Sequence, residues 1–174
     1  MVDVASSLPN EKIESEILTA SADVKKFEIQ RFYVKKQSAE VPYAPSIFNQ
    51  QEDKPETLVE MKIDHVKLSD LLYEVSLTFQ ISMKFQQQTA LRLEVQQAAV
   101  FHIEGYSNKE EGLLLNAFCP SILHPYARKV VADLSFSAGF LPITLPPINF
   151  DQAYQERQKN TEIKEIAQDL THPT

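Results

Sequence analysis

The sequence predicts an α+β domain, a four-stranded antiparallel sheet with helices packed on one side. The clearest observation lies in residues 72–85, where apolar and polar side chains alternate as in a long half-buried strand. Strand-like segments fill the chain up to about residue 103, whereas apolar residues recur at helical spacing in residues 122–137. Only three glycines occur in 174 residues, which excludes the phosphate-cradling loops of P-loop and Rossmann folds.

The four strands are predicted in chain order. Residues 27–36 are rich in aromatic and β-branched side chains, although their alternation is imperfect. Residues 58–68 alternate at first and lose phase near residue 65. Residues 72–85 and 89–103 follow, with a hairpin loop at residues 86–88. Three consecutive strands with short links predict an antiparallel meander with one solvent-exposed face.

A proline-rich connection separates the first two strands. Residues 41–58 contain Pro42, Pro45 and Pro55, which disfavour both helix and sheet. Tyr43 and Phe48 lie in the same segment. A loop this long and apolar is expected to pack over another part of the fold.

The second half predicts helices over residues 113–118 and 122–137, with Gly139 as the C-terminal stop. Prolines keep the following segment extended, and Asn149 or Asp151 can cap a last helix. The expected organisation is an N-terminal arm (1–26), one domain (27–158) and a polar C-terminal tail (159–174).

Composition narrows the class of protein. Seventeen basic and 24 acidic residues give a formal charge of −7, which argues against nucleic acid and membrane surfaces as partners. One cysteine cannot form an internal disulfide, which fits a reducing compartment. We see neither a secretory signal nor a stretch of about 20 apolar residues, so we expect a soluble cytoplasmic protein without membrane insertion.

The histidines and the cysteine form no recognisable catalytic or metal-binding pattern. None of the four histidines has a helical zinc-pair partner, and no CxxC motif occurs. Cys119 lies between Phe118 and Pro120, an apolar setting that makes a thiol inert. We therefore predict no enzyme, no metal and no cofactor. The remaining feature is the large number of apolar and aromatic side chains. They either fill the core or line an exposed groove beneath the long loops.

Five segments carry a family resemblance. They are FEIQRFYVK (27–35), EVPYAPSIF (40–48), YEVSLTF (73–79), LEVQQAAVFHIEG (93–105) and the long run LNAFCPSILHPYARKVVADLSFSAGFLPITLPPINFDQAY (115–154). With these segments the chain resembles SecB, the export chaperone family of Gram-negative bacteria. The resemblance covers residues 27–154 and leaves the arm outside.

The resemblance implies an ATP-independent chaperone. It would hold unfolded secretory preproteins in hydrophobic grooves, keep them competent for translocation and deliver them to the SecA motor. Matching positions imply client contacts at Val59, Met61, Ile63, Leu91, Phe150 and Tyr154. Tyr43 and Phe48 of the connecting loop are added for their chemistry.

The resemblance also implies a homotetramer, a dimer of dimers formed through edge strands and the long helix. The expected interface residues are Leu123, Tyr126, Val130 and Leu134. Glu40 and Glu94 match acidic residues that meet the zinc-bearing tail of SecA, the metal belonging to that partner. Lys36 and Arg92 depart from the family pattern, because an acidic and an apolar residue are expected there. These cations put the detailed docking in question.

Two other functions stay open. A SecB-like chain can serve one dedicated partner, such as a toxin–antitoxin pair, and the cations at Lys36 and Arg92 mildly favour this alternative. The other is a small ligand-binding or hydrolytic α+β domain. No feature of the sequence supports this function, but none excludes it.

Overall fold

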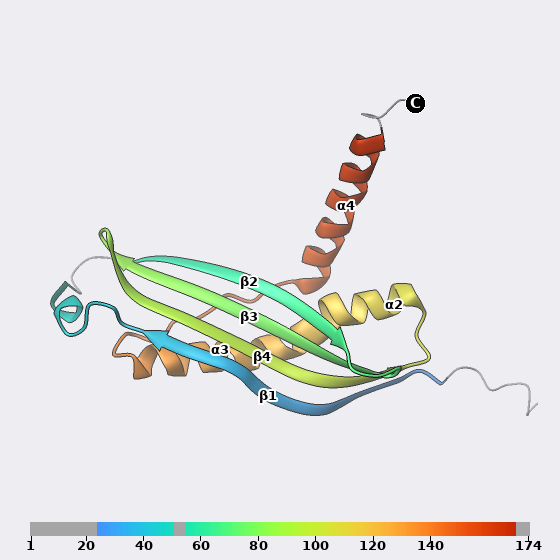
Figure 1. Cartoon of the computed structure of the whole chain (residues 1–174), viewed down its shortest axis with the longest axis horizontal. Coiled ribbons are helices and arrows are strands. Elements are labelled where there is room, and N and C mark those ends of the chain that lie inside the picture. Colours follow the sequence, from blue (N-terminus) through green and yellow to red (C-terminus); the bar gives the residue numbers. More distant parts are fainter. Residues whose placement is uncertain (1–23, 51–54, 170–174) are drawn as a thin grey trace, which may run out of the picture.

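A computed structural model describes residues 24–50 and 55–169. The sheet has the strand order β1-β4-β3-β2, with every neighbouring pair antiparallel (Figure 1). Its strands are β1 (Lys26–Glu40), β2 (Glu56–Lys67), β3 (Leu72–Phe85) and β4 (Gln88–Glu104). The predicted meander of the last three strands is confirmed. The first strand closes the sheet beside β4, so β1 and β2 form its two opposite edges.

Two register shifts explain the imperfect alternation of β1. The pairing with β4 slips between Ile29 and Arg31 and again between Val34 and Lys36. Each shift adds one residue to β1 and changes which of its residues face the helices. Strand β2, in contrast, pairs with β3 without a shift throughout its length. The change of phase near residue 65 therefore leaves the backbone register intact and places Val66 on the other face from Ile63, where it is 55% exposed.

The helical layer covers one face of the sheet (Figure 1). It runs without a break through α2 (Asn108–Leu113), a π-helical turn η2 (Leu114–Phe118) and α3 (Cys119–Ser137). The long helix therefore begins three residues earlier than predicted. Pro120 fits its first turn and Pro125 lies within it. We refer to the face of the sheet toward α3 as the inner face and to the other as the outer face.

The core lies between α3 and the inner face. The odd-numbered side chains of β3 from Tyr73 to Phe85 are all buried, as the alternation predicts. From α3 they meet Leu123, Ala127 and Val131, which are fully buried. The connection after β1 adds Ile47, which lies in a 3₁₀ turn η1 (Ser46–Gln50) and is also fully buried. The proline-rich segment thus contributes to the core.

The termini of the helices follow their expected caps. Gly139 adopts a positive φ of 90° directly after α3, where a left-handed residue ends the helix. Asn149 accepts a hydrogen bond from the amide of Gln152 and caps α4 (Phe150–Asp169). Helix α4 projects away from the sheet (Figure 1) and continues past residue 159, where the polar tail was expected to begin. The first 23 residues of the expected arm lie outside the described residues.

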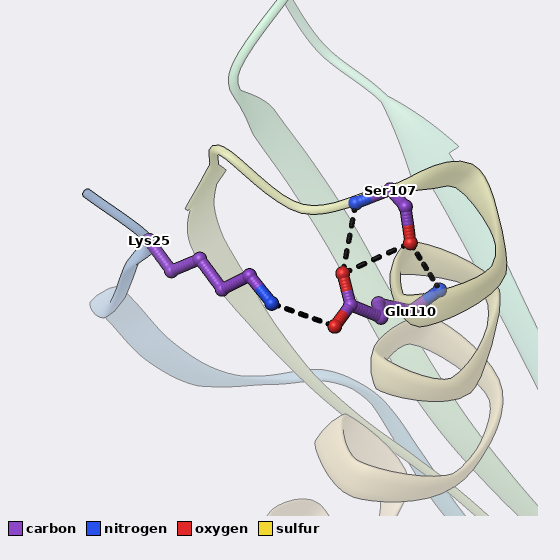
Figure 2. A network of polar contacts seen from close by, with 3 residues as sticks. All are labelled: Lys25, Ser107 and Glu110. Atoms are coloured by element: carbon purple, nitrogen blue, oxygen red, sulfur yellow. Dashed lines mark hydrogen bonds and ion pairs between the residues drawn. The ribbon is translucent and has the colours of Figure 1, made fainter. Parts of the chain in front are cut away.

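A polar network fixes the start of β1 against α2 (Figure 2). Ser107 and Glu110 form a capping box, in which the serine hydroxyl accepts from the Glu110 amide and the carboxylate accepts from the Ser107 amide. The second carboxylate oxygen of Glu110 lies 2.7 Å from the Lys25 Nζ. The network joins two segments that are 85 residues apart in the sequence.

Candidate functional site

The inner face of β2 carries a row of apolar side chains at the edge of the sheet. Val59, Met61 and Ile63 lie opposite the core residues Ile81, Phe79 and Leu77 of β3. Val59 keeps 40% of its surface exposed, and the other two are half-buried against the core. Among the described residues β2 pairs only with β3, so this row extends the core to an edge strand of the sheet.

Aromatic contacts join this row to the start of α4. Phe150 lies edge-on to His124, with ring centroids 5.6 Å apart, and His124 lies 5.9 Å from Phe79. Phe79 pairs directly with Met61. Tyr154, one turn further along α4, is half-buried against the core. The structure therefore links Met61, through Phe79 and His124, to Phe150 at the start of α4.

The two candidates of the connecting loop lie apart from that region. Phe48 packs on Phe140 after α3, with ring centroids 5.5 Å apart, and Tyr43 is 48% exposed. Phe85, at the hairpin end of β3, also contacts Phe140. These aromatic side chains lie at the end of the sheet where the β3–β4 hairpin turns.

Two of the eight client-binding candidates are buried within the single chain. Leu91 is completely buried and pairs with Met83 in the sheet, and Phe150 is 3% exposed. Both belong to the core of the described chain, and neither presents a surface to solvent. The other six, Tyr43, Phe48, Val59, Met61, Ile63 and Tyr154, keep exposed area.

The outer face carries the acidic docking candidates, and both departures from the family pattern lie beside them. The Lys36 Nζ lies 2.7 Å from the Glu94 carboxylate, and the Arg92 guanidinium lies 3.9 Å from that of Glu40. A concavity of about 300 Å³ opens at this place. Its charged lining consists of Glu40, Glu60, Arg92 and Glu94. Glu60 was missed by the sequence reasoning, although it lies two residues before Lys62 on the polar side of β2.

A second polar cluster occupies the outer face further along β1. The Tyr33 hydroxyl and the Lys35 ammonium both donate to the Glu74 carboxylate. Burial, with the hydrogen bond to Glu74, raises the pKa of Tyr33 to about 12. The hydrogen bonds from Lys35 and Tyr33 lower the pKa of Glu74. The cluster is internally neutralised and sits outside the concavity.

The predicted interface residues of α3 differ in how far they are buried within the single chain. Leu123 is fully buried against the sheet, so it is a core residue of the single chain, whereas Tyr126 is 54% exposed. Val130 and Leu134 are half-buried. Two exposed aromatic residues on the same helical run, Phe118 and Phe136, were missed. The i, i+4 spacing of Phe118, Ile122 and Tyr126 was the available signal.

Reactive side chains in the described chain are held in inert surroundings. Burial raises the pKa of the Cys119 thiol to about 12. Burial, followed by the nearby Arg128, lowers the pKa of His124, which is consistent with a neutral imidazole between Phe79 and Phe150. In residues 24–50 and 55–169 no cluster of metal-ligating side chains is found. None of the helices described there is long and apolar enough to span a bilayer.

Comparisons with known proteins place the chain in a family. The family model "Preprotein translocase subunit SecB" matches residues 20–161. The protein-export protein SecB of Nitrosococcus oceani is 42% identical over 76% of this chain and 82% of its own length. That of Neisseria gonorrhoeae is 41% identical over 76% of this chain and 90% of its own length.

A solved structure shows the same fold. It is a SecB-like chaperone of Mycobacterium tuberculosis in complex with a peptide from the HigA1 antitoxin. The two chains agree with a TM-score of 0.59 at 17% identity, over 81% of this chain and 100% of that one. At this identity the likeness concerns the fold alone.

The match to the family model spans most of the chain, and the curated relatives are aligned over more than four fifths of their own length. Membership implies interaction with preproteins and with the SecA motor. The chain belongs to the SecB family, whose members are non-enzymatic cytoplasmic chaperones of the protein-export pathway.

Proposed function

We propose that this chain holds unfolded preproteins without ATP along the apolar edge of its sheet and passes them to SecA. The single observation that carries the proposal is the row Val59, Met61 and Ile63, which continues the core to an edge strand of the sheet. Tyr154 of α4 and Tyr43 and Phe48 of the connecting loop extend the available apolar surface in two directions.

Simple energetics support weak, unselective binding at each place. Burying apolar surface is worth about 25 cal/mol per Å² before the cost of ordering a flexible client. Folded proteins hide such segments and are not retained. Several weak contacts on one assembly multiply the affinity, because each bound segment raises the local concentration of the next.

Refolding of a slow-folding secretory preprotein tests this activity. The spontaneous refolding rate should fall toward zero at about one tetramer per client, with no nucleotide present. Replacing Met61 and Ile63 with Ser should restore much of the spontaneous rate. The control Glu60→Ser with Lys62→Ser alters the opposite face of the same strand. An unchanged rate with an excess of the wild-type chain would overturn the proposal.

For the client contacts at Leu91 and Phe150, which the resemblance implies, binding must open the core locally. Client binding should then raise hydrogen exchange at these two residues. Exchange that is unchanged or slower would remove both residues from the client site, leaving the exposed candidates.

We further propose that SecA docks on the outer face through Glu40 and Glu94. The concavity beside them supports this assignment, because it offers a recessed polar surface on the outer face of the sheet, opposite the inner-face row of apolar residues on β2. Glu40→Lys with Glu94→Lys should weaken SecA binding in calorimetry and leave client binding unchanged. Glu28→Lys with Glu104→Lys makes the same charge change further along the sheet. Equal SecA affinity of the two double variants would remove the assignment.

A tetramer is part of the proposal. The exposed aromatic residues Phe118, Tyr126 and Phe136 lie along one helical run. Beside it, β1 is an edge strand, with β4 as its one partner among the described strands. A surface of this kind is costly in water unless another subunit covers it. Tyr126→Glu should shift the mass in sedimentation from four subunits toward fewer, whereas Lys129→Glu should shift it less. A wild-type monomer at micromolar concentration would contradict the tetramer.

The second candidate function is that of a chaperone for one dedicated partner. The M. tuberculosis structure carries an antitoxin peptide, but that chain is 17% identical to this one, whereas the export proteins reach 42%. Isolation of one stoichiometric partner, together with no effect on preprotein refolding, would favour the dedicated role.

A further inference from the structure

The strand register arranges the outer-face side chains in rows across the sheet. Directly opposed residues of neighbouring antiparallel strands point to the same face. One row consists of Glu40, Arg92, Ser82 and Leu58. The next consists of Ser38, Glu94, Gln80 and Glu60. All eight residues line the concavity, which therefore carries three carboxylates and one guanidinium.

The ion pairs leave three of these charges accessible to a ligand. Glu94 is held by Lys36 at 2.7 Å, and its side chain is only 27% exposed. Arg92 lies 3.9 Å from Glu40, and both side chains are at least 60% exposed. An exposed pair at that separation is worth little and opens readily. Glu60 makes no ion pair with any residue that the structure describes. Glu40, Arg92 and Glu60 are therefore the charges that a ligand can use. Of these, Arg92 is the one cation, and Glu60 is the one carboxylate without an ion pair in the described chain.

We propose that Arg92 and Glu60 determine which partner segment this face accepts. The segment presents a carboxylate to Arg92 and a lysine or arginine to Glu60. This inference rests on the proposed docking of SecA to the outer face, and it specifies the charge pattern of the SecA segment. A purely basic segment would meet the Arg92 guanidinium, and like charges brought together at an interface are unfavourable.

The separation of Arg92 and Glu60 on the sheet sets the spacing of the acidic and basic residues in the SecA segment. Arg92 is on β4 and Glu60 on β2, two strands and one row apart. Strand separations of about 4.8 Å and a rise of about 3.3 Å per residue place their Cα atoms about 12 Å apart. An extended segment covers that distance in three or four residues. The acidic and basic residues of the SecA segment should therefore lie three or four positions apart.

Two single variants of the full chain test the proposal against intact SecA. Arg92→Gln and Glu60→Gln should each weaken SecA binding by about threefold to tenfold at low salt, the range of partly screened ion pairs. Arg31→Gln and Glu28→Gln are matched controls, because both residues lie on the outer face of β1 in rows beyond the concavity. The controls should bind SecA as the wild type does. All four side chains are exposed, and client binding should be unchanged in every variant.

Two results with these variants would contradict the inference. If Arg92→Gln binds SecA as tightly as the wild type or more tightly, the segment has no acidic partner for Arg92 and the inference is wrong. If Glu60→Gln has no effect, the basic contact is made elsewhere and the charge pattern is wrong. If the wild-type chain does not bind SecA at all, the docking proposal itself fails, and that result is distinct from the other two.

Discussion

The Tyr154 hydroxyl on α4 lies so close to Gly112 on α2 that a Cβ atom at residue 112 would be 3.1 Å from it. The contact matters because α4 meets the body of the domain mainly through η2, the turn that follows α2. Asn116 of that turn also donates to the Gly112 carbonyl, at 2.8 Å. Gly112 is thus one point at which the last helix touches the helical layer.

Gly112→Ala should stabilise the protein by less than a glycine-to-alanine change in a helix normally does. That change is usually worth about 1 kcal/mol. Here the Tyr154 hydroxyl must first move by a few tenths of an ångström. Tyr154→Phe removes the hydroxyl, so the full gain should appear in the double variant. Urea denaturation of the four proteins at one concentration gives the coupling, expected at about 0.5 kcal/mol or more. Additive effects would contradict the contact.

Glu110 should make α2 sensitive to acid. The hydrogen bond from Lys25, followed by those from Ser107, lowers the Glu110 pKa from 4.5 to about 2 (Figure 2). A carboxyl group with a lowered pKa stabilises the fold above its unfolded pKa and loses that effect as pH falls toward the folded value. Glu110→Gln should therefore flatten the loss of stability between pH 4.5 and 2. Glu60→Gln, which has no described ion pair to lose, should not. Equal pH profiles would contradict the network.

The strands and their faces could be predicted because alternation reports burial directly. The odd-numbered residues from Tyr73 to Phe85 face the core as the sequence indicates. The partner of the first strand could not be found in this way. Its pairing with β4 depends on contacts between residues as distant as Phe27 and Ile103, which no local pattern encodes. The two register shifts in β1 also hide its alternation.

The same distinction between local pattern and strand pairing applies to the residues of the candidate site. Apolar client-contact candidates were named on β2 and on β4 alike, because hydrophobicity alone does not distinguish an exposed Val59 from a fully buried Leu91. That difference comes from strand order, since β4 is central and β2 is at the edge. The pairing of Lys36 with Glu94 likewise depends on two strands far apart in the chain.

His124 should weaken the fold under mildly acidic conditions. Burial lowers its pKa below 6.5, so the unfolded chain binds a proton before the folded chain does. Stability then falls as pH drops below 6.5, by at most about 1.4 kcal/mol per pH unit for one group. His124→Leu should reduce this slope, and His65→Leu, at an exposed position, should not. Stability curves between pH 7 and 5 would show it. The same slope in both variants would place the effect elsewhere.

Cys119 should resist alkylation while the chain is folded. Its pKa is raised to about 12, and its side chain is completely buried. Because the thiolate is the reactive form, iodoacetamide at pH 8 should modify the folded protein at least about a thousandfold more slowly than the urea-unfolded protein. Mass spectrometry over time gives both rates. Rapid modification without denaturant would show that the N-terminal turn of α3 opens.

Lys36→Gln should strengthen SecA docking by freeing Glu94. The wild-type Lys36 Nζ lies 2.7 Å from that carboxylate and competes with any basic residue of a partner. A gain of about twofold to fivefold at low salt is the expected size for one exposed charge, and it should disappear near 0.5 M salt. Lys35→Gln is the matched control, because Lys35 pairs with Glu74 outside the concavity. Weaker binding of Lys36→Gln would show that SecA contacts Lys36 itself, and the face would then select a more acidic segment than we propose.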